Sequence, residues 1–170
     1  FIECIKGYDE ALKYVNGQSR SVQNDRPIIG QFGVNREGSG DMYYKGALML
    51  NTIRHIINDD VKWWKLLYNY SETYKKQIID TKTVIDYFNK ESGLDLTSVF
   101  NQYLTTTKIP KLVLSKTGNK LSYEWQNVNT DFKMPVDIVI NEKTIRLHPT
   151  TSKQETKIDK KIKLENIQVK

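Results

Sequence analysis

The chain has 170 residues, of which 38% are hydrophobic, and its 26 Lys and Arg against 20 Asp and Glu give a net charge of +6. This length suits one domain or two small ones, and the ten Tyr add to a packed globular core. No apolar run is long enough to span a membrane. The basic residues are interleaved with acidic and apolar ones, which favours a solvated face over a nucleic-acid site.

Residues 8–57 have the pattern of two helices separated by a loop. The first helix is expected from Tyr8 to about Val22, because apolar residues recur on one face. Asn24 to Gly38 should form a loop, since Pro27 bars a helix at that point. The second helix is expected from Asp41 to Ile57, with an apolar stripe formed by Leu50, Ile53 and Ile57.

Three more helices are expected before residue 107. Asn58-Asp59-Asp60 should turn the chain and cap a helix from Val61 to about Lys75. Thr81 or Thr83 should cap the next helix, which ends before Gly93. A short helix follows, with Thr97 near its start. The side chains expected to pack from the first of these helices are Trp63, Leu66, Leu67 and Tyr70.

The periodicity changes at the polar stretch 105–110, which ends in a proline and is the best candidate for a domain boundary. Apolar and polar residues then alternate, as in half-buried strands. Thr117-Gly118-Asn119 and Asn141-Glu142 are typical of hairpin turns, and a final strand is expected between Ile162 and Val169. The sequence therefore predicts an α+β chain, helical over 1–107 and a small antiparallel β-sandwich of the Ig or fibronectin kind over 108–170.

The residues that commonly hold metals or perform nucleophilic chemistry are few in this chain. The two histidines, His55 and His148, are far apart in sequence and fall in different expected domains, which argues against a metal site. The single cysteine, Cys4, cannot form an internal disulfide, and its apolar surroundings predict a buried side chain. The adjacent Asp59 and Asp60 are explained by a helix cap and a solvated turn.

The stretch 39–50 contains the strongest candidate for function. Ser39 or Asp41 can accept hydrogen bonds from the free amides at the start of a helix, and Asp41 also suits the positive end of the helix dipole. Tyr43 then lies at the start of a helix that continues into a core, where a phenol can be held rigidly beside a cleft. The alternative is that Tyr43 and Tyr44 are packing residues at a helix end.

Tyr43-Tyr44-Lys45-Gly46 resembles the Tyr-x-Lys-Gly motif of the zinc aminopeptidases related to aminopeptidase N and leukotriene hydrolase, the gluzincin metallopeptidases. Four further blocks resemble this family in its order. The first two, 1–11 and 23–30, are similar to the helix pair after the third zinc ligand and to the loop before the tyrosine. The last two, 90–104 and 132–136, are similar to the end of the catalytic domain and to the β-sandwich that follows.

The resemblance implies that the chain is the C-terminal part of a larger enzyme. The family's His-Glu-x-x-His motif with its distant Glu, and its Gly-x-Met-Glu-Asn segment, are both missing and by the family's order should precede Phe1. The helical part would then complete a thermolysin-like catalytic domain. Zinc and the peptide substrate would belong to the full-length protein, and this fragment would bind no zinc and be inactive alone.

The resemblance also implies roles for single residues. By its position in the motif, Tyr43 would be catalytic and donate a hydrogen bond to the carbonyl oxygen that becomes negatively charged during peptide hydrolysis. Lys45 and Gly46 would be structural, with Gly46 allowing close helix packing. The expected partner is the missing N-terminal part of the catalytic domain.

Two further interpretations remain open. Without the missing part, self-association is expected through exposed apolar residues, led by Ile2, Ala11 and Val15. The alternative to a peptidase is a non-catalytic binding or scaffold module that joins a helical bundle to an Ig-like sandwich.

Overall fold

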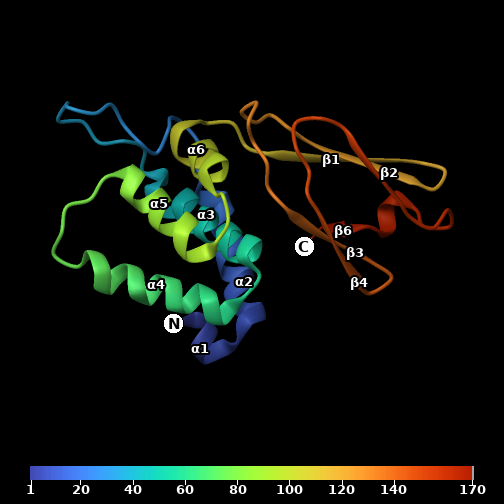
Figure 1. Ribbon diagram of the computed structural model, residues 1–170, viewed down its shortest axis with the longest axis horizontal. Coiled ribbons are helices and arrows are strands. Elements are labelled where there is room, and N and C mark those ends of the chain that lie inside the picture. Colours follow the sequence, from blue (N-terminus) through green and yellow to red (C-terminus); the bar gives the residue numbers. More distant parts are fainter. Residues whose placement is uncertain (170) are drawn as a thin grey trace. The chain divides into compact units, whose positions relative to one another are not determined.

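A computed structural model describes residues 1–169 of the chain. Within them it has six α-helices and two antiparallel sheets of three strands each, so the fold class is α+β as the sequence predicts (Figure 1). The chain divides into two compact units, Phe1–Thr107 and Lys108–Lys170, which we call the helical unit and the β unit. No helix in the described part of the chain is both long and apolar enough to cross a membrane.

The helical unit contains all six α-helices. Helix α3 has the bounds that the sequence predicts, whereas the first long helix is shorter than expected because the chain tightens into a 3₁₀ turn after Gly17. The helices are α1 (Ile2–Lys6), α2 (Tyr8–Gly17), α3 (Asp41–Ile57), α4 (Asp60–Tyr74), α5 (Thr81–Ser92) and α6 (Thr97–Thr105), and the 3₁₀ turn covers Gln18–Ser21. The loop expected between Asn24 and Gly38 has no helix or strand.

The helix ends show which capping predictions are right. The Asp59 side chain accepts a hydrogen bond from the Lys62 amide at 3.0 Å, so the predicted cap of α4 is confirmed. The cap of α5 is Asp80, and the expected Thr81 or Thr83 cap is wrong. The Asp80 carboxylate accepts from both the amide and the hydroxyl of Thr83, at 2.7 Å and 2.6 Å, which fills the cap position one residue earlier.

The core of the helical unit is apolar and rich in aromatic rings. On α3 the buried stripe consists of Met49, Ile53 and Ile56, whereas the expected Leu50 is 36% exposed. The expected Ile57 is only half-buried, and α3 contacts both α4 and α6. The Phe88 ring packs edge-on against Phe100, with centroids 5.4 Å apart.

The β unit is built from two hairpins and two short added strands. One sheet has the order β1-β2-β5 and the other β4-β3-β6. Gly118 and the pair Asn141 and Glu142 have positive φ, so both predicted hairpin turns are confirmed. The strands are β1 (Lys111–Thr117), β2 (Lys120–Gln126), β3 (Val136–Ile140), β4 (Lys143–Leu147), β5 (Gln154–Lys157) and β6 (Gln168–Val169).

The two sheets of the β unit bury one apolar cluster between them. Leu121 on β2 and Ile138 on β3 are fully buried in it, so side chains from both sheets meet in one core. At one side, the Trp125 indole donates a hydrogen bond to the carbonyl oxygen of Met134 at 2.9 Å and packs on Phe132. The remaining buried members of the cluster are Ile140, Leu147 and Ile167.

One strand prediction and one burial prediction are wrong, and one strand was not predicted at all. The expected last strand shrinks to Gln168–Val169, because Leu164–Asn166 forms a 3₁₀ turn and Ile162 packs on the core from outside a strand. Strand β5 has only polar residues and therefore gave no apolar alternation to detect. Cys4 is exposed, because α1 is a single short helix with no buried side chain.

Candidate functional site

Tyr43 lies in the first turn of α3, and 73% of its surface is exposed. Tyr44 is 41% exposed. The alternative interpretation of both rings as packing residues is therefore not supported for Tyr43, which is largely open to solvent. An exposed ring can position a hydroxyl group only if the backbone that carries it is held in place. Two residues on the buried face of the same helix, Asp41 and Lys45, hold it.

Asp41 anchors the loop before α3 rather than the helix itself. Its side chain is 1% exposed and accepts hydrogen bonds from the amides of Gln23 and Asn24 at 2.9 Å and 2.6 Å. The expected bond from Asp41 to amides of its own helix is absent, since the residue before the helix is Gly40 and no side chain caps α3. Ser39 does take part as expected, because its hydroxyl accepts from the Asp41 amide at 3.2 Å.

Lys45 lies one turn further along the same buried face and is 5% exposed. Its ammonium group donates to Oδ1 of Asn24 at 3.0 Å and to the carbonyl oxygen of Thr106 at 2.8 Å. Burial lowers the pKa of the Lys45 amine, and the nearby Asp41 charge opposes that change. These contacts agree with the structural role that the motif resemblance implies for Lys45.

Asn24 joins the two anchors. It has a positive φ of 49°, a backbone region that Asn tolerates better than most residues, and its side-chain amide donates to the carbonyl oxygen of Thr107. Asp41, Lys45 and Asn24 therefore connect the loop, the first two turns of α3 and the segment after α6. We call these three side chains the α3 anchor.

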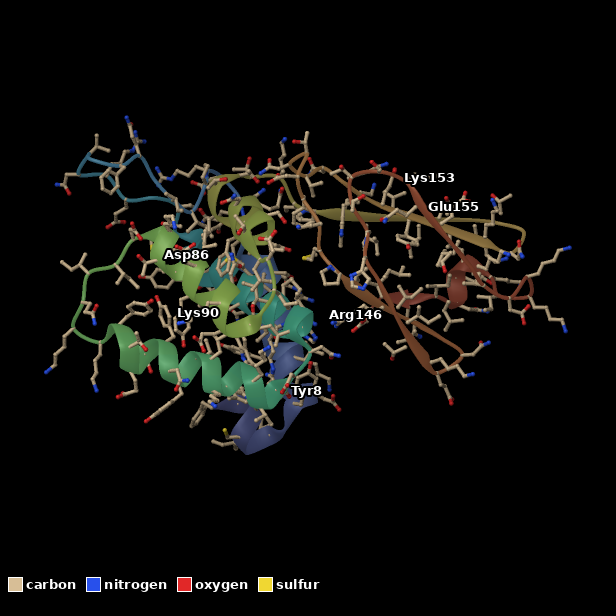
Figure 2. All side chains as sticks on the ribbon, viewed as in Figure 1. Tyr8, Asp86, Lys90, Arg146, Lys153 and Glu155 are labelled. Carbon is tan, nitrogen blue, oxygen red and sulfur yellow. The ribbon has the colours of Figure 1, made fainter. Side chains whose placement is uncertain are left out.

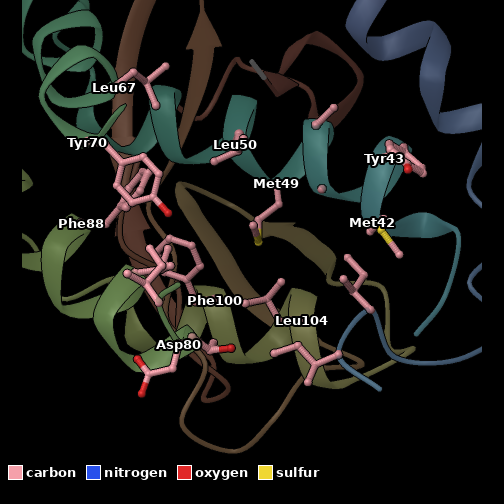
Figure 3. A pocket seen from close by; sticks show the side chains of 17 residues that line it. Met42, Tyr43, Met49, Leu50, Leu67, Tyr70, Asp80, Phe88, Phe100 and Leu104 are labelled. Atoms are coloured by element: carbon pink, nitrogen blue, oxygen red, sulfur yellow. The ribbon is translucent and has the colours of Figure 1, made fainter. Parts of the chain in front are cut away.

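An open apolar hollow of about 640 Å³ begins beside Tyr43 and continues along α3 (Figure 3). In Figure 3, Tyr43 lies at one end of the hollow, Met49 lies near its middle and Tyr70 lies toward the other end. Gly46 also lines it, and a Cβ atom added there would meet nothing within 4 Å. The expectation that Gly46 allows close helix packing is therefore wrong for this chain, because no neighbouring element occupies the space.

A second polar cluster holds the other end of α3. Arg54 is 8% exposed, and its guanidinium group pairs with both oxygens of Glu3 at 2.7 Å and 2.8 Å and with both oxygens of Asp60 at 2.8 Å and 2.9 Å. It also lies 5.1 Å from the ring centroid of Tyr8, which Figure 2 labels, and 5.0 Å from that of Trp64.

The charges of this cluster stabilise one another. Hydrogen bonds from Arg54 hold the pKa of Glu3 and of Asp60 below their usual values, and the same bonds raise the pKa of Arg54. Asp60 is thus an ion-pair partner and not only part of a solvated turn. Because Glu3 belongs to α1, the cluster fastens that short helix to α3 and α4.

The described residues contain no group of three His, Cys, Asp or Glu side chains that could hold a metal ion. His55 lies near the hydroxyl of Tyr8, at 3.4 Å from its oxygen, and His148 is an exposed residue of the β unit. The structure thus does not bring the two histidines together at a shared site within either unit.

A second surface hollow, of about 530 Å³, lies among α1, α2 and α4. Ile2, Ala11 and Val15, which the sequence marks as an apolar face, all line it. Its rim includes Tyr14 and Trp64, which are 55% and 50% exposed.

The chain was also compared with known proteins. No model of a known protein family matches it, and no curated protein matches it. The interpretation of the site therefore rests on its own geometry and on the motif resemblance described above.

Sequence reasoning missed the α3 anchor and the Arg54 cluster, although one signal was present. Counting back from Ile53 in steps of four gives Met49, Lys45 and Asp41, so the two charged residues continue the buried stripe of the helix. Tyr43 lies two residues from each of them and thus on the opposite face. No local signal pairs Arg54 with Glu3, which is 51 residues away.

Proposed function

We propose that the chain is the C-terminal part of a zinc aminopeptidase of the aminopeptidase N and leukotriene hydrolase family, which removes N-terminal residues from peptides. In this proposal the helical unit completes a thermolysin-like catalytic domain, and Tyr43 is its catalytic tyrosine. The observation that carries the proposal is the combination of an exposed phenol, 73% open to solvent, with a helix start that the α3 anchor fixes from below.

The chemistry asked of Tyr43 is the donation of one hydrogen bond. When a peptide bond is attacked, negative charge develops on the carbonyl oxygen, and a donor already in place stabilises that charge more than it stabilises the substrate. The Tyr43 hydroxyl is free to face a substrate because its ring projects from the exposed side of α3. Tyr44, the next residue, has no catalytic role in this proposal.

The residues of this chain do not fit a zinc site, since the described part contains no suitable group of three ligands. The proposal therefore assigns zinc, and the residues that hold it, to a preceding part of the full-length protein. It also assigns the main partner of the helical unit to that part, which would cover apolar surface along α1 and α2. The role of this chain is limited to positioning and hydrogen-bond donation.

The test is steady-state kinetics of the full-length protein on a chromogenic amino-acid amide. Tyr43→Phe removes only the hydroxyl and should lower kcat by about a hundredfold or more, because a donor to the developing charge is lost. KM should change little, and the protein should remain folded, because an exposed ring is not needed for packing. Tyr44→Phe is the matched control and should leave kcat unchanged.

Either of two results would contradict this assignment. If Tyr43→Phe kept nearly normal turnover, Tyr43 would not be the donor. If Tyr44→Phe were the damaging change, the motif would be aligned one residue out of place.

A non-catalytic binding module is the second candidate function. It is favoured by the hollow among α1, α2 and α4, where Tyr14 and Trp64 expose large aromatic surfaces of the kind enriched at protein interfaces. The coding sequence upstream of Phe1 separates the two candidates. An intact His-Glu-x-x-His motif with its distant Glu would support the peptidase, and a degenerate motif would support the binding module.

A further inference from the structure

The start of α3 carries no cap of its own. Gly40 precedes the helix and has no side chain to cap it, and the bond from the Asp41 amide to the Ser39 hydroxyl comes from one residue before the cap position. The loop before it, residues 22–40, has no helix or strand and contains four of the nine glycines of the chain. A helix start of this kind frays unless other contacts hold it.

The α3 anchor supplies those contacts from the buried face. Asp41 holds the loop through two backbone amides, and Lys45 holds Asn24 together with the backbone carbonyl of Thr106. These bonds involve charged groups with 1% and 5% exposure, so they are stronger than neutral surface bonds. A third attachment is the bond from the Ile29 amide to the carbonyl oxygen of Leu104, 3.0 Å long, which ties the same loop to α6.

The electrostatics show that the charged form of Lys45 depends on Asp41. The Lys45 ammonium is buried and its two acceptors, an amide oxygen and a backbone carbonyl oxygen, are both neutral. A buried cation with neutral partners is costly unless a negative charge is nearby. Asp41 provides that charge one helical turn away, and its Coulomb interaction favours the charged form of Lys45.

We propose that Lys45 is a positioning residue, which fixes the direction of the Tyr43 hydroxyl through Asn24 and the first two turns of α3. The inference rests on the proposed function, in which Tyr43 donates to the substrate. It goes further by making the lysine of the motif necessary for turnover rather than for the stability of the fold alone. A donor displaced by as little as about 1 Å loses much of its effect on a transition state.

The test is a double-mutant cycle in the full-length protein, measured as kcat and KM on the same amino-acid amide. Lys45→Met keeps the aliphatic volume and removes the three donors. It should lower kcat at least about tenfold with KM nearly unchanged. In a protein that already carries Tyr43→Phe, the same change should lower kcat less than about twofold, because Lys45 then has no donor to position.

Lys62→Met is the matched control. Lys62 on α4 also holds a helix end through a backbone carbonyl, since its ammonium donates to Ser92 at 2.6 Å. This variant should lose thermal stability without a specific loss of kcat. If Lys45→Met does not fold, Asn24→Gly replaces it, because Gly keeps the positive φ of residue 24 while removing the side chain that Lys45 holds.

The outcomes separate this inference from the proposed function. The positioning role would be overturned if Tyr43→Phe lowered kcat and Lys45→Met lowered kcat by the same factor with and without Tyr43→Phe. The catalytic role of Tyr43 would then still stand. A kcat loss in Lys62→Met equal to that in Lys45→Met would also overturn it, since any weakened helix end would then suffice. Normal turnover of Tyr43→Phe would overturn the proposed function itself.

Discussion

The two units of the chain bury different kinds of side chain. The helical unit contains 13 basic and 13 acidic residues and is neutral, whereas the β unit contains 13 basic and 7 acidic residues and carries the whole net charge of +6. Yet the buried charges lie in the neutral unit, where Asp41, Lys45 and Arg54 are all less than 9% exposed. In the β unit the one buried polar residue among those described is Ser122, which is uncharged.

This difference shows two ways of holding small structures together. The β unit fixes its strands by backbone pairing and one apolar cluster, so its charges can remain on the surface. The helical unit must fasten the loop before α3 and the short helix α1, neither of which buries an apolar side chain completely. Buried ionic groups do this work, because a charged hydrogen bond is directional and reaches backbone groups that apolar packing cannot hold.

A substitution that creates a cavity in the core of the β unit should cause the largest loss of stability. Ile138 is fully buried between the two sheets, and Ile138→Ala should lower the free energy of unfolding by about 3 kcal/mol. The loss should be confined to the β unit, where Trp125 reports unfolding, while far-UV signals from the helices persist. Ile145→Ala, at a 38% exposed position of β4, is the control and should cost less than about 1 kcal/mol.

Removing the cation at the end of α3 should give the next largest effect. Arg54→Met leaves Glu3 and Asp60 close together without a partner, and we expect a loss of about 2 kcal/mol. This is below the range for fully buried pairs, because the Asp60 side chain is 60% exposed and can be hydrated. Chemical denaturation followed at Trp63 and Trp64 measures it.

An exposed ion pair on the same unit provides the matching control. Lys82 pairs with Asp86 on α5, with 80% and 59% of the two side chains exposed, and Lys82→Met should be nearly silent. If Arg54→Met were equally silent, the contrast between a charge-fastened unit and an apolar unit would not hold.

The elements of both units were largely predictable from sequence because their signals are local. Asp41 to Ile57 has a helical stripe along its whole length, and Asn141-Glu142 occupies a turn that requires positive φ. The errors also have local causes. Strand β5 has no apolar residue, so its pairing with β2 depends on backbone hydrogen bonds that composition does not reveal.

The candidate site was predictable only as one residue. The motif resemblance pointed to Tyr43, but the contacts of Lys45 with Asn24 and Thr106 span 21 and 61 residues. Such contacts depend on the path of the long loop before α3. Hydrophobic periodicity in the sequence does not predict that path. The Gly46 prediction was wrong because it presumed a neighbour that this chain does not supply.

Acid should weaken the helical unit, by less than the loss of Arg54. The folded-state pKa values of Glu3 and Asp60 lie below their ordinary values of 4.5 and 3.8. The stabilisation from this pairing is therefore complete above about pH 5 and is lost as the pH falls through the lowered values. The difference in stability between the wild type and Arg54→Met should shrink below pH 4. If this difference in stability stayed constant down to pH 2, the charges of Glu3 and Asp60 would not be the source of the stabilisation.

The smallest expected effect tests whether an exposed carboxylate in the helical unit acts as a hydrogen-bond acceptor or only as a charge. Asp80 caps α5 through the amide and hydroxyl of Thr83. Asp80→Ala should cost about 1 kcal/mol, since the first turn of α5 then loses its acceptor. Asp80→Asn keeps an acceptor of the same shape and should retain most of the stability. Thermal unfolding of the three proteins measures both changes. If Asp80→Asn lost as much as Asp80→Ala, charge at the helix start would matter more than the bond, and the surface of the helical unit would then resemble its interior in depending on ionic groups.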